Sequence, residues 1–88
     1  MFLHLGKDVL VEIKDVISII NIEKNKSNIT SEFLETAKDE GFIKKIGIDE
    51  AKSLVITEIK NRSIIFLSPI SSSTLYKRAG FIDGISII

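Results

Sequence analysis

The residues best suited to chemistry in this chain lie between Ser68 and Gly80, in the stretch SPISSSTLYKRAG. This stretch holds the chain's only proline, a run of three serines, and Lys77 next to Arg78. Hydroxyl groups beside basic side chains can bind a phosphate, supply a nucleophilic serine, or cap the first turn of a helix. These interpretations point to a nucleic-acid-binding protein, an enzyme and a structural segment, respectively.

A catalytic serine needs a general base, and the chain offers few candidates. Its one histidine, His4, lies between Leu3 and Leu5 in an expected strand, so alternation points it away from both leucines, towards solvent or an interface. The sequence contains no nucleophile-elbow motif and no phosphate-binding loop of the GxxxxGKS or GxGxxG type. A lone histidine without cysteine or a suitably spaced carboxylate is also a poor metal site. We therefore expect no enzyme, no metal and no cofactor.

For the serines we favour the structural interpretation. One of the serines at 71–73 can be the N-cap of a short helix over residues 71–79, because its hydroxyl can accept from an otherwise unpaired backbone N–H. Leu75, four residues before the last alanine of this helix, would hold it against the core. The alternative stays open that this helix start, with Lys77 and Arg78, holds a backbone phosphate of DNA.

Short apolar and β-branched runs, bounded by turn residues, predict strands along most of the chain. Their expected ranges are 2–5, 9–13, 16–22, 42–46, 53–59 and 63–67. Gly6-Lys7-Asp8 would join the first two as a hairpin, and Lys60-Asn61-Arg62 would join the last two. Pro69 ends the last of these strands because it has no N–H to donate to a ladder.

Between residues 29 and 40 the apolar spacing changes to that of a helix, with Ile29, Phe33 and Ala37 four residues apart. Asn28 or Thr30 can cap its start, and Gly41 is placed to end it. Strands, helix, strands and a short helix predict a single small α+β domain over residues 1–88, with mainly antiparallel pairing. The apolar tail 81–88 is expected to need a partner surface, and its conformation is not predicted.

Composition favours a cytoplasmic protein that associates with itself. The chain is 44% hydrophobic, has 18 isoleucines and no cysteine, and lacks both a signal-peptide pattern and an apolar run long enough to cross a membrane. Such apolar content in so short a chain suggests that another subunit covers part of it. The aromatic residues are expected mostly in the core, which disfavours base stacking.

The net charge is zero, but its distribution is uneven. Residues 1–41 carry five basic and eight acidic side chains, whereas residues 42–88 carry seven basic and four acidic ones. The second half can therefore form a basic face, built from Lys44 and Lys45, Lys52, and Lys60 with Arg62. Ordinary scatter of charges would give the same counts.

Two segments, HLGKDVLV at 4–11 and SPISSSTLYKRAGFI at 68–82, resemble the bacterial RemA/RemB family of extracellular-matrix regulators, and the RemB branch most closely. Their order and spacing fit that family over most of the chain. The resemblance implies a non-enzymatic, DNA-binding regulator of extracellular matrix and biofilm genes. It further implies a LytTR-like protomer that assembles into rings around which DNA can wrap.

The family's DNA-contacting arginines are replaced here. Asp15 stands where an arginine after the second strand is expected, and 49–52 reads DEAK in place of an arginine pair, leaving only Lys52. Our leading hypothesis is a homo-oligomeric regulator that contacts phosphates of duplex DNA through six residues: Lys14, Lys52, Lys60, Arg62, Lys77 and Arg78. The alternative is an oligomeric protein-interaction or scaffold module without DNA binding. A small-molecule sensor would need an apolar pocket with convergent polar groups, and the sequence indicates none.

Overall fold

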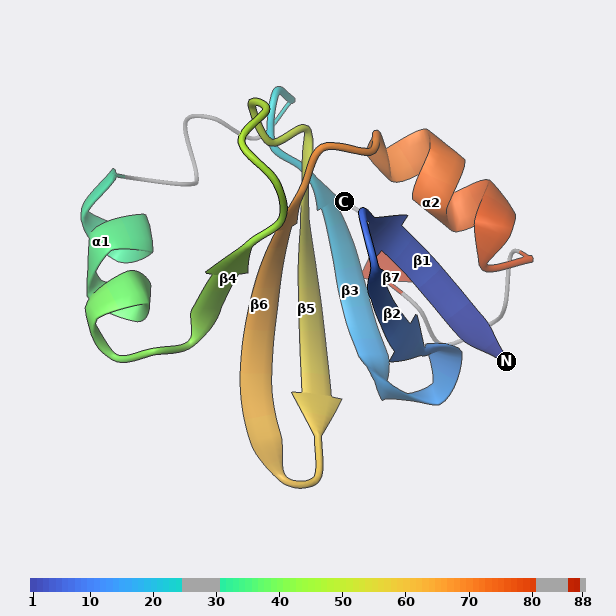
Figure 1. Cartoon of the computed structure of the whole chain (residues 1–88), viewed down its shortest axis with the longest axis horizontal. Helices are drawn as coiled ribbons and strands as arrows, with labels where there is room; N and C mark the ends of the chain where they lie inside the picture. Colours follow the sequence, from blue (N-terminus) through green and yellow to red (C-terminus); the bar gives the residue numbers. More distant parts are fainter. Residues whose placement is uncertain (25–30, 81–85, 88) are drawn as a thin grey trace.

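The computed structural model describes residues 1–24, 31–80 and 86–87. A five-stranded sheet has the order β4-β6-β5-β3-β7, and β1 and β2 form a separate two-stranded sheet (Figure 1). The helix α2 packs against β1 and β3, whereas α1 lies beside β4 at the opposite edge (Figure 1). The elements are β1 (Phe2–Gly6), β2 (Val9–Glu12), the 3-10 turn η1 (Ile13–Asp15), β3 (Val16–Asn21), α1 (Ser31–Asp39), β4 (Ile43–Lys45), β5 (Ser53–Ile59), β6 (Arg62–Ser68), α2 (Ser72–Arg78) and β7 (Ser86–Ile87).

The α+β class and both predicted hairpins are confirmed. Strands β5 and β6 pair antiparallel in unbroken register from Ser53 opposite Ser68 to Ile59 opposite Arg62. Lys60 and Asn61 form the turn with φ of 49° and 65°. Positive φ at both central residues is the geometry of a type I′ turn, whose twist matches that of the strands it joins. The hairpin β1–β2 forms where expected, although Ile13 leaves the strand and begins η1.

The prediction of mainly antiparallel pairing is also confirmed, with two exceptions among the described strands. Strand β4 pairs parallel with β6, so that Lys45 lies beside Leu67, and β7 pairs parallel with β3. Parallel neighbours cannot be joined by a tight turn. The chain instead reaches β4 by way of α1, and then crosses to β5 through residues 46–52 before β6 returns along β4.

The short helix forms as the serines predict. The Ser71 side chain accepts a hydrogen bond from the Thr74 N–H at 3.3 Å, which makes Ser71 the N-cap of α2. Leu75 and Ala79 are fully buried, so α2 is held to the core by the predicted contacts. Beyond Gly80, residues 81–85 and 88 of the apolar tail lie outside the described part of the chain.

The longer helix α1 ends at the predicted glycine. Gly41 has a φ of +78°, its N–H donates to the Lys38 carbonyl, and the Phe42 N–H donates to the Ala37 carbonyl. This pair of bonds is a Schellman motif, which satisfies carbonyls that the helix leaves unpaired. The predicted start at Ile29 and the caps Asn28 and Thr30 lie outside the described residues.

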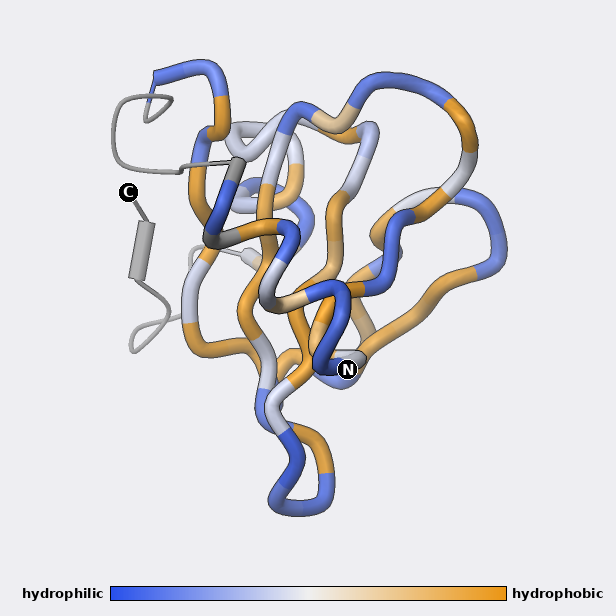
Figure 2. The backbone as a smooth tube through the Cα atoms, turned by 90° about the vertical axis from the view of Figure 1, so that its left-hand side faces the viewer, coloured by the Kyte–Doolittle hydropathy of each residue, from blue (hydrophilic) through white to orange (hydrophobic). Residues whose placement is uncertain are grey.

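The core lies between the two sheets and α2. Most of its buried members come from strands, η1 and α2, and they include Leu3, Leu5, Val11, Ile19, Val55, Phe66 and Leu75. Figure 2 shows the strands as largely hydrophobic and the projecting turn between β5 and β6 as hydrophilic. The structure contains buried hydroxyls as well: Ser68 Oγ donates to the Leu5 carbonyl at 2.6 Å and accepts from the Ile70 N–H at 3.1 Å. Among the described residues, every buried side-chain polar atom has a partner.

The expectation that aromatic residues lie mostly in the core is wrong for two of them. Phe66 is buried, but Phe2 is 62% exposed and Phe42 is 45% exposed. Phe2 is the first residue of β1 and lies on the outer face of the β1–β2 sheet, because alternation turns Leu3 and Leu5 inwards. None of the described helices is long and apolar enough to cross a membrane.

Candidate nucleic-acid interface

The six candidate phosphate-binding residues do not form one patch, because the fold places them in three regions. Lys60 and Arg62 lie at the turn of the β5–β6 hairpin, which projects beyond the other strands (Figure 1), and Lys14 lies nearby. Lys52 precedes β5 at the opposite end of that strand. Lys77 and Arg78 form the end of α2.

The hairpin end presents cations on both of its sides. Lys60 lines a surface hollow of about 570 Å³ together with Lys14, and Arg62 lines another of about 460 Å³ together with Lys44. All four side chains are exposed. The fold thus gathers four cations at one end of the molecule, although they come from η1, β4, the turn and β6. Lys44 was expected only as one member of the basic face, and the pairing of β4 with β6 brings it beside Arg62.

Carboxylates offset part of this charge. Glu12 and Asp15 line the hollow that holds Lys14 and Lys60, and Glu40 lines the hollow that holds Arg62. Lys14 Nζ lies 3.1 Å from Glu12 Oε2. The hydrogen bond and charge of Glu12, with the charge of Asp15, raise the pKa of Lys14 above its ordinary value. Lys14 therefore stays protonated at neutral pH, but part of its field is cancelled locally.

Of the two cations at the end of α2, Arg78 has a structural partner. Arg78 Nη1 donates to the His4 carbonyl at 3.2 Å, which ties the end of α2 to β1. Lys77 is exposed in the last turn, where the helix dipole favours a cation. The Ser71 hydroxyl is already used within α2, because it bonds both the Thr74 N–H and Thr74 Oγ1. The capping role therefore accounts for the first of the three serines.

Lys52 lies apart from the hairpin end. Its N–H donates to the Ser68 carbonyl and its carbonyl accepts from the Ile22 N–H, so its backbone is fixed between β3 and β6. A strand rises about 3.3 Å per residue, which separates Lys52 from Lys60 by roughly 25 Å along β5. The neighbouring Asp49 and Glu50 are exposed, as expected for solvated carboxylates. Lys52 cannot contact the phosphates next to those held by Lys60.

The catalytic and metal interpretations both depend on the surroundings of His4 and of the acidic side chains. His4 is exposed, as its alternation predicts, and its Nε2 lies within hydrogen-bonding distance of the Lys7 carbonyl. Among residues 1–24, 31–80 and 86–87, no three histidine, cysteine, aspartate or glutamate side chains gather to hold a metal ion. The feature that remains is the hairpin end, where four cations gather with three carboxylates.

Comparisons with known proteins show the family of the chain. Residues 2–79 match the family model RemA-like, described as "Extracellular matrix regulatory protein A-like". The chain is also 41% identical, over 81 residues, to Extracellular matrix regulatory protein B of Bacillus subtilis (strain 168), and the match covers 92% of this chain and 93% of that protein. The similarity to a B-type protein confirms the resemblance to the RemB branch that the serine-rich segment indicates. The chain therefore belongs to the RemA-like family of extracellular matrix regulatory proteins.

Proposed function

We propose that this protein is a homo-oligomeric regulator of extracellular matrix genes that binds duplex DNA through its β5–β6 hairpin end. The observation that carries the proposal is the projection of Lys60 and Arg62 from the sheet, with Lys14 on one side and Lys44 on the other. Cations on a projecting turn can approach phosphates without collision from the rest of the protein. Such contacts supply affinity and position rather than sequence choice.

Charge at this end makes binding by a single protomer weak. The two hollows together hold four cations, Lys14, Lys44, Lys60 and Arg62, against three carboxylates, Glu12, Asp15 and Glu40. Several protomers that present the same end along one duplex would multiply this small excess, because each later contact becomes intramolecular. Useful affinity therefore requires self-association.

Exposed apolar side chains support such self-association. Phe2 and Leu10 are 62% and 59% exposed on the outer face of the β1–β2 sheet. They lie on neighbouring strands, since Leu10 pairs with His4 and Phe2 pairs with Glu12. A second copy covering this face would remove apolar area from water, which is the main driving force for stable association.

The test is a titration of promoter-length duplex at low and moderate salt, comparing wild type with a Lys60→Glu, Arg62→Glu double variant. We expect wild-type binding to weaken steeply with salt, and the double variant to lose at least about 10-fold in affinity and about 2 in salt slope per bound protomer. The matched control is Lys7→Glu with Lys24→Glu, which makes the same charge change on exposed lysines of other turns. Equal losses in both double variants would refute the location, and salt-insensitive or absent wild-type binding would refute the function.

A scaffold module that oligomerises without touching DNA is the second candidate. The observation that favours it is the near balance of charge at the hairpin end beside the exposed Phe2 and Leu10. Light scattering separates the two functions when it is combined with the DNA titration. An oligomer with no salt-sensitive DNA binding supports the scaffold, and a monomer excludes both multivalent mechanisms.

A further inference from the structure

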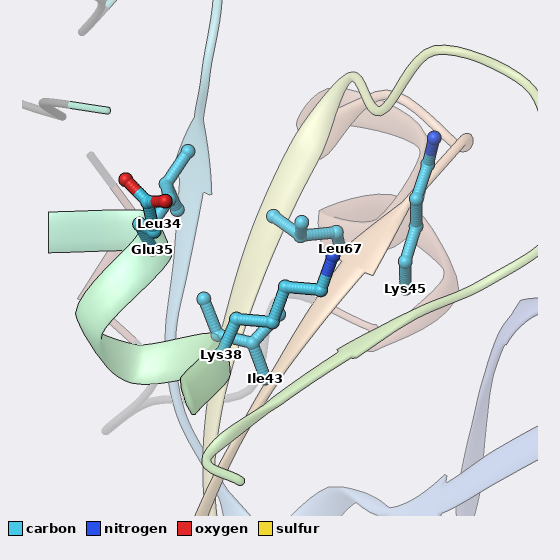
Figure 3. A pocket seen from close by; sticks show the side chains of 6 residues that line it. All are labelled: Leu34, Glu35, Lys38, Ile43, Lys45 and Leu67. Carbon is cyan, nitrogen blue, oxygen red and sulfur yellow. The ribbon is translucent and has the colours of Figure 1, made fainter. Parts of the chain in front are cut away.

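A pocket of about 410 Å³ opens between α1 and the edge strand of the main sheet (Figure 3). Leu34, Glu35 and Lys38 line it from the helix, and Ile43, Lys45 and Leu67 line it from β4 and β6. Its volume lies within the range of small-molecule sites in proteins, about 300–1,000 Å³. It shares no lining residue with the two hollows at the hairpin end.

Helix spacing, strand register and backbone hydrogen bonds fix the positions of the residues that line this pocket. Leu34 and Lys38 are four residues apart, so they share one face of α1. Ile43 and Lys45 are two residues apart on β4 and share a face of that strand, and the register places Leu67 beside Lys45. The Schellman bonds at Gly41 and the Phe42 carbonyl, which accepts from the Ile65 N–H, hold the end of α1 against the sheet.

The chemistry of the lining is amphipathic. Leu34, Ile43 and Leu67 are half-buried and give the pocket an apolar floor. Lys38 extends from α1 across Ile43 towards Leu67, Lys45 rises along the opposite wall, and the Glu35 carboxylate lies beside Leu34 (Figure 3). Neither lysine has a carboxylate within ion-pair distance in the described part of the chain. The pocket thus combines apolar surface that a ligand could cover with two ammonium groups that form no ion pair among the described residues and with one carboxylate.

We propose that this pocket binds a small amphipathic anion, a carboxylate carrying a short apolar chain. The chain would cover Leu34, Ile43 and Leu67, which favours binding through apolar burial. The carboxylate would accept charge-assisted hydrogen bonds from the ammonium groups, whose flexible stems let both reach one anion. Lys44, between Ile43 and Lys45 on β4, faces the hollow of Arg62, so the anion site and the hairpin end lie on opposite faces of one strand.

Octanoate is the probe, and ¹⁵N-labelled full-length protein reports its binding through backbone amide shifts in NMR titrations. We expect saturable shifts centred on Leu34, Lys38, Ile43, Lys45 and Leu67. Acetate, which lacks the apolar chain, and octylamine, which carries the opposite charge, should each bind at least about 10-fold more weakly. A Lys38→Glu, Lys45→Glu double variant should lose at least about 10-fold in octanoate affinity, whereas Lys7→Glu with Lys24→Glu should not.

Each outcome supports or overturns the proposal. Absence of saturable shifts, equal binding of octylamine, or equal affinity in the double variant and its control overturns it. The proposal is also overturned if octanoate does not bind and the double variant differs from wild type in solution mass, because the pocket is then a contact surface between copies of the protein. Circular dichroism confirms that the variants are folded. DNA binding plays no part in this readout, so the proposed function and the anion site can fail independently.

Discussion

Ser68→Ala tests whether the serine-rich stretch is structural or a phosphate site. The Ser68 side chain is fully buried, donates to the Leu5 carbonyl at 2.6 Å, and accepts from the Ile70 N–H at 3.1 Å. It thereby joins β1 to the turn that leads into α2, across 63 residues of sequence. Alanine removes both bonds without adding bulk. We expect a folded but clearly less stable protein.

The expected loss of stability can be estimated from the two polar groups that lose their partner in Ser68→Ala. The Leu5 carbonyl would lose a buried partner, which costs about 1–3 kcal/mol, and the part-buried Ile70 N–H would lose an ordinary bond worth about 0.5–1.5 kcal/mol. The expected loss of unfolding free energy is therefore about 2–4 kcal/mol. Ser71→Ala should cost about 1 kcal/mol, the usual value of an N-cap. Ser73→Ala, on an exposed side chain, should cost less than about 0.5 kcal/mol.

Urea unfolding followed by circular dichroism measures the three variants, at one fixed protein concentration because self-association adds to apparent stability. The three substitutions make the same chemical change within six residues, so each serves as a control for the others. DNA affinity is then measured under conditions where every variant is fully folded. We expect it to remain within about twofold of wild type in all three, since none of these hydroxyls is assigned to a phosphate.

Two results would refute this reasoning. Ser68→Ala with wild-type stability would show that the buried bonds do not hold the turn. Loss of DNA affinity in Ser71→Ala or Ser73→Ala at unchanged stability would show that the hydroxyls contact phosphate, so that the structural interpretation of the motif is wrong.

Two further predictions concern charge and backbone. Glu12→Gln should raise DNA affinity and steepen the salt dependence of binding by about 1 per bound protomer, because it frees Lys14 from its 3.1 Å ion pair. If the salt slope in the duplex titration stays unchanged, Lys14 does not contact the DNA. Gly41→Ala should lower the free energy of unfolding, measured in urea, by about 1–2 kcal/mol, because an alanine at a φ of +78° is strained. Among the described residues, no atom lies within 4 Å of the added Cβ, so the loss comes from backbone strain and not from a steric clash. Glu40→Ala, next to it, should change stability little, and equal losses in the two variants would contradict this account.

Features that depend on a few neighbouring residues could be predicted from the amino-acid sequence alone. The hairpin turn, the cap at Ser71 and the end of α1 at Gly41 all form where predicted, except that Arg62 belongs to β6 and leaves Lys60 and Asn61 as the turn. Each is set by backbone dihedrals and hydrogen bonds that close within about five residues, so the residue types carry the information. The family could be inferred for a related reason, because the segments that carry the resemblance contain the turn of the first hairpin, at Lys7 and Asp8, and the cap at Ser71.

The contacts between distant segments could not be predicted in this way, because they depend on the whole fold. Lys14 comes beside Lys60 because β3, which follows η1, pairs with β5. Lys44 comes beside Arg62 because β4 pairs parallel with β6. Ser68 bonds to Leu5 because β1 packs against α2, close to the turn that Ser68 begins. The composition could not show that Lys52 lies apart from the rest of the predicted basic face, because counts of charged residues carry no information on the distances between them. Pairing order depends on which apolar faces bury one another across the whole chain, and that competition leaves no local signal. The anion pocket, bounded by elements from both halves of the chain, likewise exists only once α1 is held against the sheet edge.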